Sequence, residues 1–233
     1  MMRLTAAALA LLTLAGCASF SPDGGFGEVE RLTQERVGHA PTYLRTSEQT
    51  DAAKARVAEL LKQALNADSA VEIALLNNRD LQASYAELGI AESDLVRAGR
   101  PANPSFRFGR LSNGSGTEID RAVLFDVLGL VTLPLTQQAE RRHFEQVQLQ
   151  AAIDTLGVAS EARKAFFEAV TARQLVGYAG QVKDAADASN ELARRMAAAG
   201  NLNKLAQMRE QSFYSDATAQ LARARHQALA TRE

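Results

Sequence analysis

A long segment without helix-breaking residues constrains the fold of this chain more than any other feature. Between Thr136 and about Ala199 there is no proline, and glycine occurs only at positions 157, 177 and 180. Apolar side chains recur through the segment at helical intervals, which predicts one continuous α-helix. At 1.5 Å per residue, about 64 residues of helix span roughly 95 Å. A single globular domain of this size cannot enclose such a helix, so we expect coiled-coil packing in an elongated object.

A tight turn and a second helix are predicted to follow. Gly200 and Asn201 are turn residues, and either Asn201 or Asn203 can cap a helix that starts at Lys204. The chain has much alanine and only five prolines, a composition that favours long helices. We therefore expect residues 135–233 to form a long helical hairpin whose turn lies near residue 200.

Residues 51–100 are also predicted to be helical. Ser69 and Glu72 have the spacing of a capping box at the start of a short helix. From Asp80 onward, apolar residues recur close to the coiled-coil period, which predicts a longer helix. This helix should end near Gly99, because two prolines follow and prevent its continuation.

The periodicity then changes from helical to alternating. Residues 105–108 alternate polar and apolar side chains, and Asn113-Gly114 is a typical hairpin turn. A second alternating run begins at Glu118. We therefore predict one antiparallel β-hairpin over residues 104–131, and Pro134 then marks the return to helix.

A lone two-stranded hairpin is marginally stable in water, and strands in a membrane need a closed barrel. This hairpin is therefore expected to join strands from elsewhere in a transmembrane barrel. Three of its residues either line an aqueous lumen or lie at the interfacial ends of the strands: Arg107, Arg110 and Arg121. Three others either face lipid, which we favour, or pack between strands: Phe106, Phe108 and Phe125.

The first residues are typical of a secretory signal peptide. A short start with Arg3 precedes an apolar stretch over residues 4–14, too short to span a bilayer, which takes about 20 residues. The stretch ends in Leu-Ala-Gly-Cys, which resembles the bacterial lipobox, whose cysteine carries the lipid. We therefore expect residues 1–16 to be a signal peptide and Cys17 to be the lipid attachment site. The alternative is a chance cysteine after an ordinary signal peptide.

The residue after the cysteine bears on which bacterial membrane the lipoprotein is sorted to. Residue 18 is alanine rather than aspartate, which by resemblance to known lipoprotein sorting favours the outer membrane. Residues 17–50 are rich in glycine and are expected to be a lipid-anchored tether with one short helix from Glu28 to Val37.

The order of these elements resembles one structural repeat of the TolC-like outer-membrane efflux proteins. Two segments are similar to helices of that family, Val71–Leu81 and Gly89–Gly99. Residues 101–104 stand where the family enters its first strand, and residues 130–135 stand where it leaves the second. The resemblance implies a mainly α fold of very long antiparallel coiled-coil helices, with one hairpin in an oligomeric transmembrane β-barrel.

The segment from Arg195 to Met208 resembles the periplasmic tip of that family. Its matching residues are Arg195, Gly200 and Leu205, which the resemblance implies contact a periplasmic adaptor protein. Ala206 stands where the family usually has an acidic residue, so this contact departs from the family pattern.

The resemblance implies a passive exit duct for substrates that an inner-membrane pump and an adaptor deliver. Members of the family form homotrimers of full-length chains and move drugs, metal ions or secreted proteins. This sequence corresponds to the first of two repeats. We expect a fragment, and the alternative is a second half on another chain. A different class of function is also open, a periplasmic coiled-coil lipoprotein that acts as a scaffold or spacer without a pore.

Other classes have little support in the sequence. A net charge of -1 and a pI of about 6.3 do not favour a nucleic-acid partner. The three histidines lie in separate segments without metal-ligand spacing: His39, His143 and His226. The sequence has no glycine-rich phosphate loop and no nucleophile elbow. We therefore expect no enzyme, no metal site and no cofactor.

Overall fold

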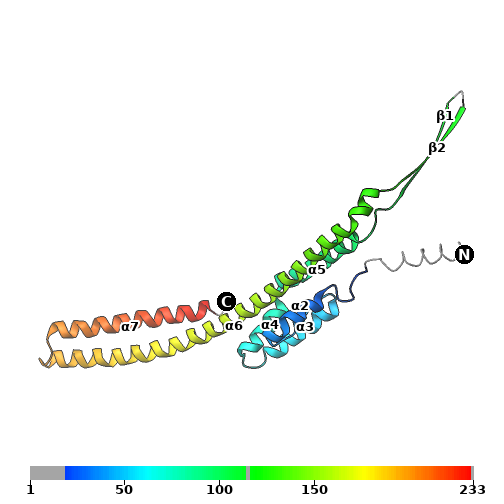
Figure 1. Ribbon diagram of the computed structural model, residues 1–233. Coiled ribbons are helices and arrows are strands. Elements are labelled where there is room, and N and C mark those ends of the chain that lie inside the picture. Colours follow the sequence, from blue (N-terminus) through cyan, green and yellow to red (C-terminus); the bar gives the residue numbers. More distant parts are fainter. Residues whose placement is uncertain (1–18, 114–115, 232–233) are drawn as a thin grey trace. The chain divides into compact units, whose positions relative to one another are not determined.

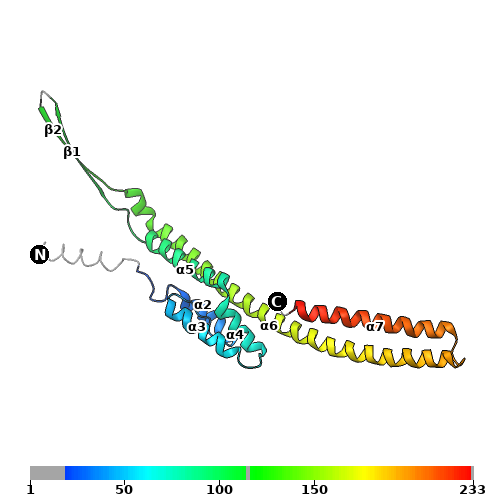
Figure 2. The same ribbon diagram turned by 180° about the vertical axis from the view of Figure 1, so that it is seen from behind.

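The computed structural model describes residues 19–113 and 116–231. Their fold is mainly helical, with one small two-stranded antiparallel sheet (Figures 1 and 2). The prediction of a mainly α fold with a single β-hairpin is therefore confirmed at this level. The expected signal peptide at residues 1–16 and the expected lipid site at Cys17 lie outside the described residues.

The described residues form two compact units. The first comprises residues 19–55 and 75–157, and the second comprises residues 56–74 and 158–231. The elements in chain order are α2 (Phe26–Val37), α3 (Ser47–Leu60), α4 (Ala67–Asn77), α5 (Arg79–Ala98), β1 (Ser105–Asn113), β2 (Gly116–Leu124), α6 (Val127–Ala198) and α7 (Lys204–Ala230).

An aromatic cluster holds the N-terminal segment against α5 in the first unit. The Phe26 ring of α2 lies edge-on to Tyr85 with 4.9 Å between centroids, and the Tyr43 ring lies 5.9 Å from Tyr85. The Tyr85 side chain is fully buried. Gln82 forms two further hydrogen bonds with the main chain on either side of Tyr43. The described part of segment 17–50 is thus folded onto α5 rather than extended away from it.

The N-terminal cap of α4 differs from the expected capping box. Asn66 is the cap: its Oδ1 accepts from the Ser69 N–H at 2.8 Å, and the Ser69 Oγ accepts from the Asn66 N–H at 2.9 Å. Glu72 instead pairs with Arg56, whose Nε lies 2.6 Å from the Glu72 Oε1. The predicted capping box of Ser69 and Glu72 was therefore wrong by three residues. Asn66 and Ser69 have the same three-residue spacing as Ser69 and Glu72, and the structure uses the first pair because α4 begins at Ala67.

The start of α6 also differs from the expectation. The second strand ends at Leu124 and the helix begins at Val127, so the last part of the predicted 104–131 hairpin is helical. The Asp126 Oδ1 accepts a hydrogen bond from the Gly129 N–H at 2.8 Å, and this bond caps α6. Pro134 lies inside α6 and does not mark its start. The alternating apolar pattern continued past the end of the strand and concealed this cap.

In the second unit, α7 runs back along α6 (Figures 1 and 2). Buried alanines recur every seven residues along this part of α6: Ala172, Ala179, Ala186 and Ala193. A seven-residue repeat is the seam of a coiled coil, and alanine lets the helix axes approach closely. Ala217 of α7 is buried as well. Ser189 of α6 donates to Glu210 of α7 at 2.6 Å, and Lys183 lies 5.8 Å from the centre of the Tyr214 ring.

Across the described residues, no helix combines the length and the apolar character needed to cross a lipid bilayer.

Candidate functional site

The pairing register of the hairpin sorts its side chains onto two faces. Residues directly opposite each other in an antiparallel pair share a face, and neighbours along a strand alternate. One face carries the pairs Phe106↔Val123, Phe108↔Arg121 and Arg110↔Ile119. The other face carries the pairs Ser105↔Leu124, Arg107↔Ala122 and Gly109↔Asp120.

The phenylalanine face is exposed to an unusual degree. Phe106 and Phe108 are 75% and 71% exposed, and Ile119 and Val123 are each about half exposed. Large apolar side chains rarely gather at such exposure unless another surface covers them. The sequence pattern located these residues correctly, because alternation directly specifies the face of a strand.

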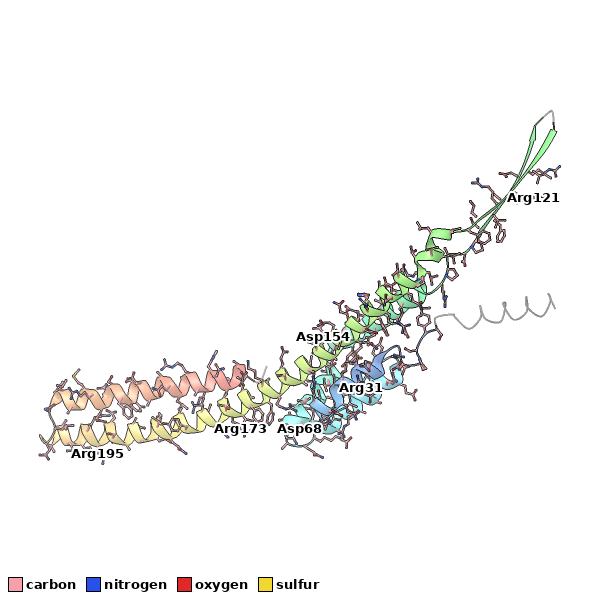
Figure 3. The ribbon with its side chains drawn as sticks, viewed as in Figure 1. Arg31, Asp68, Arg121, Asp154, Arg173 and Arg195 are labelled. Carbon is pink, nitrogen blue, oxygen red and sulfur yellow. The ribbon has the colours of Figure 1, made fainter. Side chains whose placement is uncertain are left out.

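The three arginines of the hairpin are divided between the faces. Arg110 and Arg121 lie on the phenylalanine face, and Arg107 lies on the opposite face beside Asp120. Figure 3 shows Arg121 on the strand pair. The register therefore gives the three arginines two different environments, whereas the sequence analysis gave all three the same pair of alternatives.

The helical turns after the hairpin carry a second group of exposed apolar side chains. Phe125 follows β2, and the others lie on the first turns of α6: Val127, Leu128, Leu130, Val131 and Leu135. Sequence reasoning missed the group on α6, because it assigned residues up to 131 to the hairpin. The signal that could have found it is the scarcity of charge, since residues 122–139 contain a single ionisable side chain, Asp126.

The expected adaptor contact lies where α6 turns into α7. Arg195 is close to the end of α6 (Figure 3), Gly200 is in the turn and Leu205 is in the first turn of α7. The Arg195 side chain is 77% exposed and its Nε lies 2.8 Å from Oε1 of Glu191. Leu205 is exposed too. The structure therefore brings the three predicted residues to one end of the helical hairpin.

The backbone at this turn explains its residue types. Gly200 has φ of +78°, a left-handed conformation that strains other residues. The Asn201 N–H donates to the Met196 carbonyl at 2.9 Å, which closes the end of α6. The Asn203 side chain accepts from the Ala206 N–H at 2.8 Å and caps α7. Of the two candidate caps, Asn203 is the one that the structure uses.

A buried polar network joins α5 to the first-unit part of α6. The Thr155 hydroxyl donates its proton to the Ala151 carbonyl at 2.7 Å. Because that proton is already used, the Tyr85 hydroxyl, whose oxygen lies 2.8 Å from the Thr155 Oγ1, is the donor between the two side chains. Ser84 donates to Asp154 at 2.6 Å beside it. Burial raises the pKa of Tyr85 to about 12, and the phenol is therefore neutral at physiological pH.

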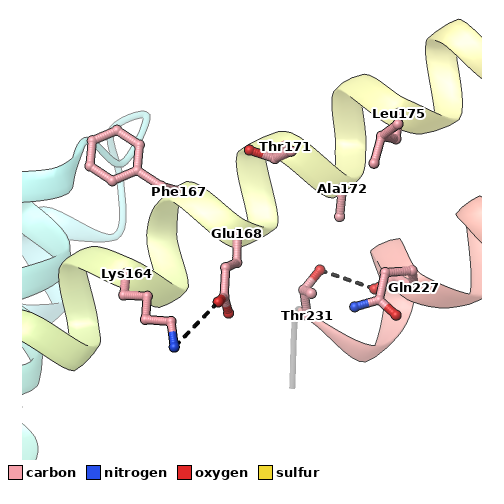
Figure 4. Close-up of a pocket in the computed structure, with 8 residues that line it drawn as sticks. All are labelled: Lys164, Phe167, Glu168, Thr171, Ala172, Leu175, Gln227 and Thr231. Atoms are coloured by element: carbon pink, nitrogen blue, oxygen red, sulfur yellow. Dashed lines mark hydrogen bonds and ion pairs between the residues drawn. The ribbon is translucent and has the colours of Figure 1, made fainter.

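A hollow lies beside the end of α7 (Figure 4). It has a volume of about 580 Å³ and is lined by Lys164, Phe167, Glu168, Thr171, Ala172, Leu175, Gln227 and Thr231. Its two charged residues form an ion pair with each other at 3.7 Å. The Thr231 hydroxyl donates to the Gln227 carbonyl at 3.1 Å. The polar groups of the lining are thus largely engaged within the chain.

A larger apolar groove of about 980 Å³ lies nearby in the second unit, lined by Leu65, Phe166, Ala169, Val170, Arg173, Val176, Arg225, Ala228 and Leu229. Neither hollow contains a histidine or a cysteine. Within the described part of the chain, no three His, Cys, Asp or Glu side chains are placed to hold a metal ion together.

Comparisons of the chain with models of protein families, with curated proteins and with solved structures found no match. A functional assignment therefore depends on the chemistry of the residues described above.

Proposed function

We propose that this chain is part of the outer-membrane channel of a tripartite efflux system. In this role it is a passive exit duct for substrates that an inner-membrane pump and a periplasmic adaptor deliver. The observation that carries the proposal is the hairpin with its exposed phenylalanine face, inserted between two long helices.

The physical chemistry of strands in lipid supports this reading. Two strands leave two unpaired edges, and unpaired backbone groups cost several kcal/mol each in a hydrocarbon layer. A hairpin with an exposed apolar face is therefore satisfied in a bilayer only as part of a closed barrel. In the proposed homotrimer, the hairpins of several copies or repeats close such a barrel in the outer membrane.

The two faces of the hairpin fit the two sides of a barrel wall. The phenylalanine face meets lipid, and the face with Arg107 and Asp120 meets the aqueous lumen. Arg110 and Arg121 on the phenylalanine face extend their long side chains toward the polar interface. Lipid on Cys17 anchors the same protein to the outer membrane.

The helical hairpin supplies the periplasmic part of the duct. Its alanine seam supports coiled-coil packing, and its end presents Arg195, Gly200 and Leu205 to the adaptor. This assignment extends the resemblance to the TolC-like family. The competing function is a periplasmic coiled-coil scaffold or spacer without a pore, which the alanine seam supports equally well but which gives the phenylalanine face no role.

Membrane extraction separates the two functions. The signal peptide and Cys17 are replaced by a cleavable signal peptide followed by serine, so that the chain is exported without a lipid. We expect the protein to remain in the membrane after alkaline carbonate washing and to require detergent. A matched F106D/F108D variant should be released by carbonate, because charge on the lipid face prevents insertion. Release of the unaltered hairpin under the same wash would favour the scaffold.

A further inference from the structure

An apolar collar lies at the junction between the hairpin and α6. We use this name for seven side chains: Val123, Phe125, Val127, Leu128, Leu130, Val131 and Leu135. Each of them is at least half exposed, and Leu128 reaches 74%. The single charge between residues 122 and 139 is Asp126, whose carboxylate is engaged as the cap of α6.

The helical part of the collar is one-sided. Successive helical residues are about 100° apart, so the collar residues from Val127 to Leu135 fall within one broad arc of α6. Gly129, Thr132 and Leu133 fall on the opposite side of the helix and are half-buried. The first turns of α6 therefore form an amphipathic helix whose apolar side has no partner among the described residues.

Arginines flank the collar in the sequence and form what we call its arginine border. Residues 97–142 contain seven arginines against four acidic residues and no lysine. Among the ion pairs of the described residues, none involves Arg100, Arg121 or Arg141. Arginine binds phosphate through paired N–H groups, so this border is complementary to an anionic headgroup layer.

We propose that the apolar collar binds the surface of an anionic lipid bilayer, with its side chains at the boundary between headgroups and acyl chains. The proposal rests on the function proposed above and adds where the bilayer ends, namely between Leu135 and the charged residues from Glu140 to Arg142. The first turns of α6 then lie in the membrane interface rather than wholly in the periplasm.

Charge favours lipid over a second copy of the chain as the occupant. Two collars that face each other would bring arginine borders of the same sign together, which is unfavourable. Lipid headgroups neutralise those arginines, and acyl chains adapt to side chains of any shape. The collar is also continuous along the chain with the hairpin face assigned to lipid.

The absence of tryptophan from the chain makes a direct test possible. Single tryptophans are introduced as L128W in the collar and as I153W on the same helix. Ile153 is 60% exposed but lies outside the collar. The full chain is reconstituted into phosphatidylglycerol vesicles with brominated acyl chains, which quench nearby indole. We expect L128W emission to shift to the blue and fall by about half or more, while I153W emission stays unchanged.

A third variant, F106W, reports on the hairpin and separates the two proposals. Quenching of L128W without quenching of F106W would support the collar and contradict the barrel. Quenching of F106W alone would overturn the collar proposal and leave the channel. A blue-shifted but unquenched L128W would show a protein partner, such as a second copy, and would also overturn it. Unchanged emission from both L128W and F106W would contradict both proposals.

Discussion

Gly25 shows how a single backbone position fixes the N-terminal segment. Its φ is +77°, and a Cβ added there would lie 2.3 Å from the Phe144 ring of α6. The Gln148 side chain donates to the Gly25 carbonyl at 2.9 Å. The residue therefore needs both a left-handed backbone and the absence of a side chain.

We predict that G25A lowers the free energy of unfolding by clearly more than G38A. Gly38 has a similar φ of +82°, but an added Cβ would have nothing within 4 Å. G38A therefore measures the left-handed strain alone, about 1–2 kcal/mol. G25A adds the clash with Phe144. Urea unfolding followed by helical circular dichroism gives both values, and equal losses would contradict the described packing of residue 25 on α6.

Tyr85 predicts a specific loss of stability in alkali. Burial raises its pKa from 10.0 to about 12, so the folded state holds the phenol proton more tightly than the unfolded state. The stabilisation is complete below pH 10 and is lost as the pH rises toward 12, with a slope of up to ~1.4 kcal/mol per pH unit.

The Y85F variant isolates this contribution. At neutral pH it should lose about 1 kcal/mol, because the hydrogen bond to Thr155 is removed. Between pH 10 and 12, its unfolding free energy should fall less steeply than that of the unaltered chain. Urea titrations at several pH values compare the two slopes. Parallel slopes would mean that Tyr85 ionises without resistance from its surroundings.

Among the elements, local signals predicted which segments form helices and strands and placed both ends of α5. Asn78 caps α5 through the Leu81 N–H, and Gly99 follows its end as expected. Alternation found the hairpin, whose strands pair from Ser105↔Leu124 to Asn113↔Gly116, and Gly114 of the expected turn lies outside the described residues. These elements are specified by residues within a few positions of each other, so one sequence suffices to locate them.

The errors arose where two local signals competed or where contacts were distant in the chain. The Asn66 cap overlapped a plausible cap at Ser69, and Asp126 ended an alternation that otherwise continued. The packing of the segment around Tyr43 on α5 was not predictable, because it depends on contacts tens of residues apart. The collar was not predicted either, because its residues share one side of a helix only once α6 is known to start at Val127.

The turn between α6 and α7 gives a test at this scale. N203A should destabilise α7 by about 1 kcal/mol, because the Ala206 N–H loses its acceptor. N201A is the matched control, since Asn201 contributes its main chain to the turn. Thermal unfolding monitored by circular dichroism compares the two. A larger loss for N201A would show that the other asparagine is the cap.

For the assembled molecule, the proposed adaptor contact is the first claim to test. We predict that R195A/L205A weakens binding of the periplasmic adaptor about tenfold or more, the loss of a small interface hot spot. R173A/L175A alters the same residue types on an exposed part of α6 far along the chain from the turn, and should bind normally. Site-specific crosslinking in cells gives the comparison. Equal crosslinking of both variants to the adaptor would show that the turn is not part of the interface.

Single-channel conductance in planar bilayers shows whether the protein forms a channel. The measurement compares the purified product of the whole gene that contains this chain with its F106D/F108D variant. We predict uniform, stable conductance steps that the variant lacks. Silence from a helical, reconstituted protein would contradict the channel and favour the scaffold.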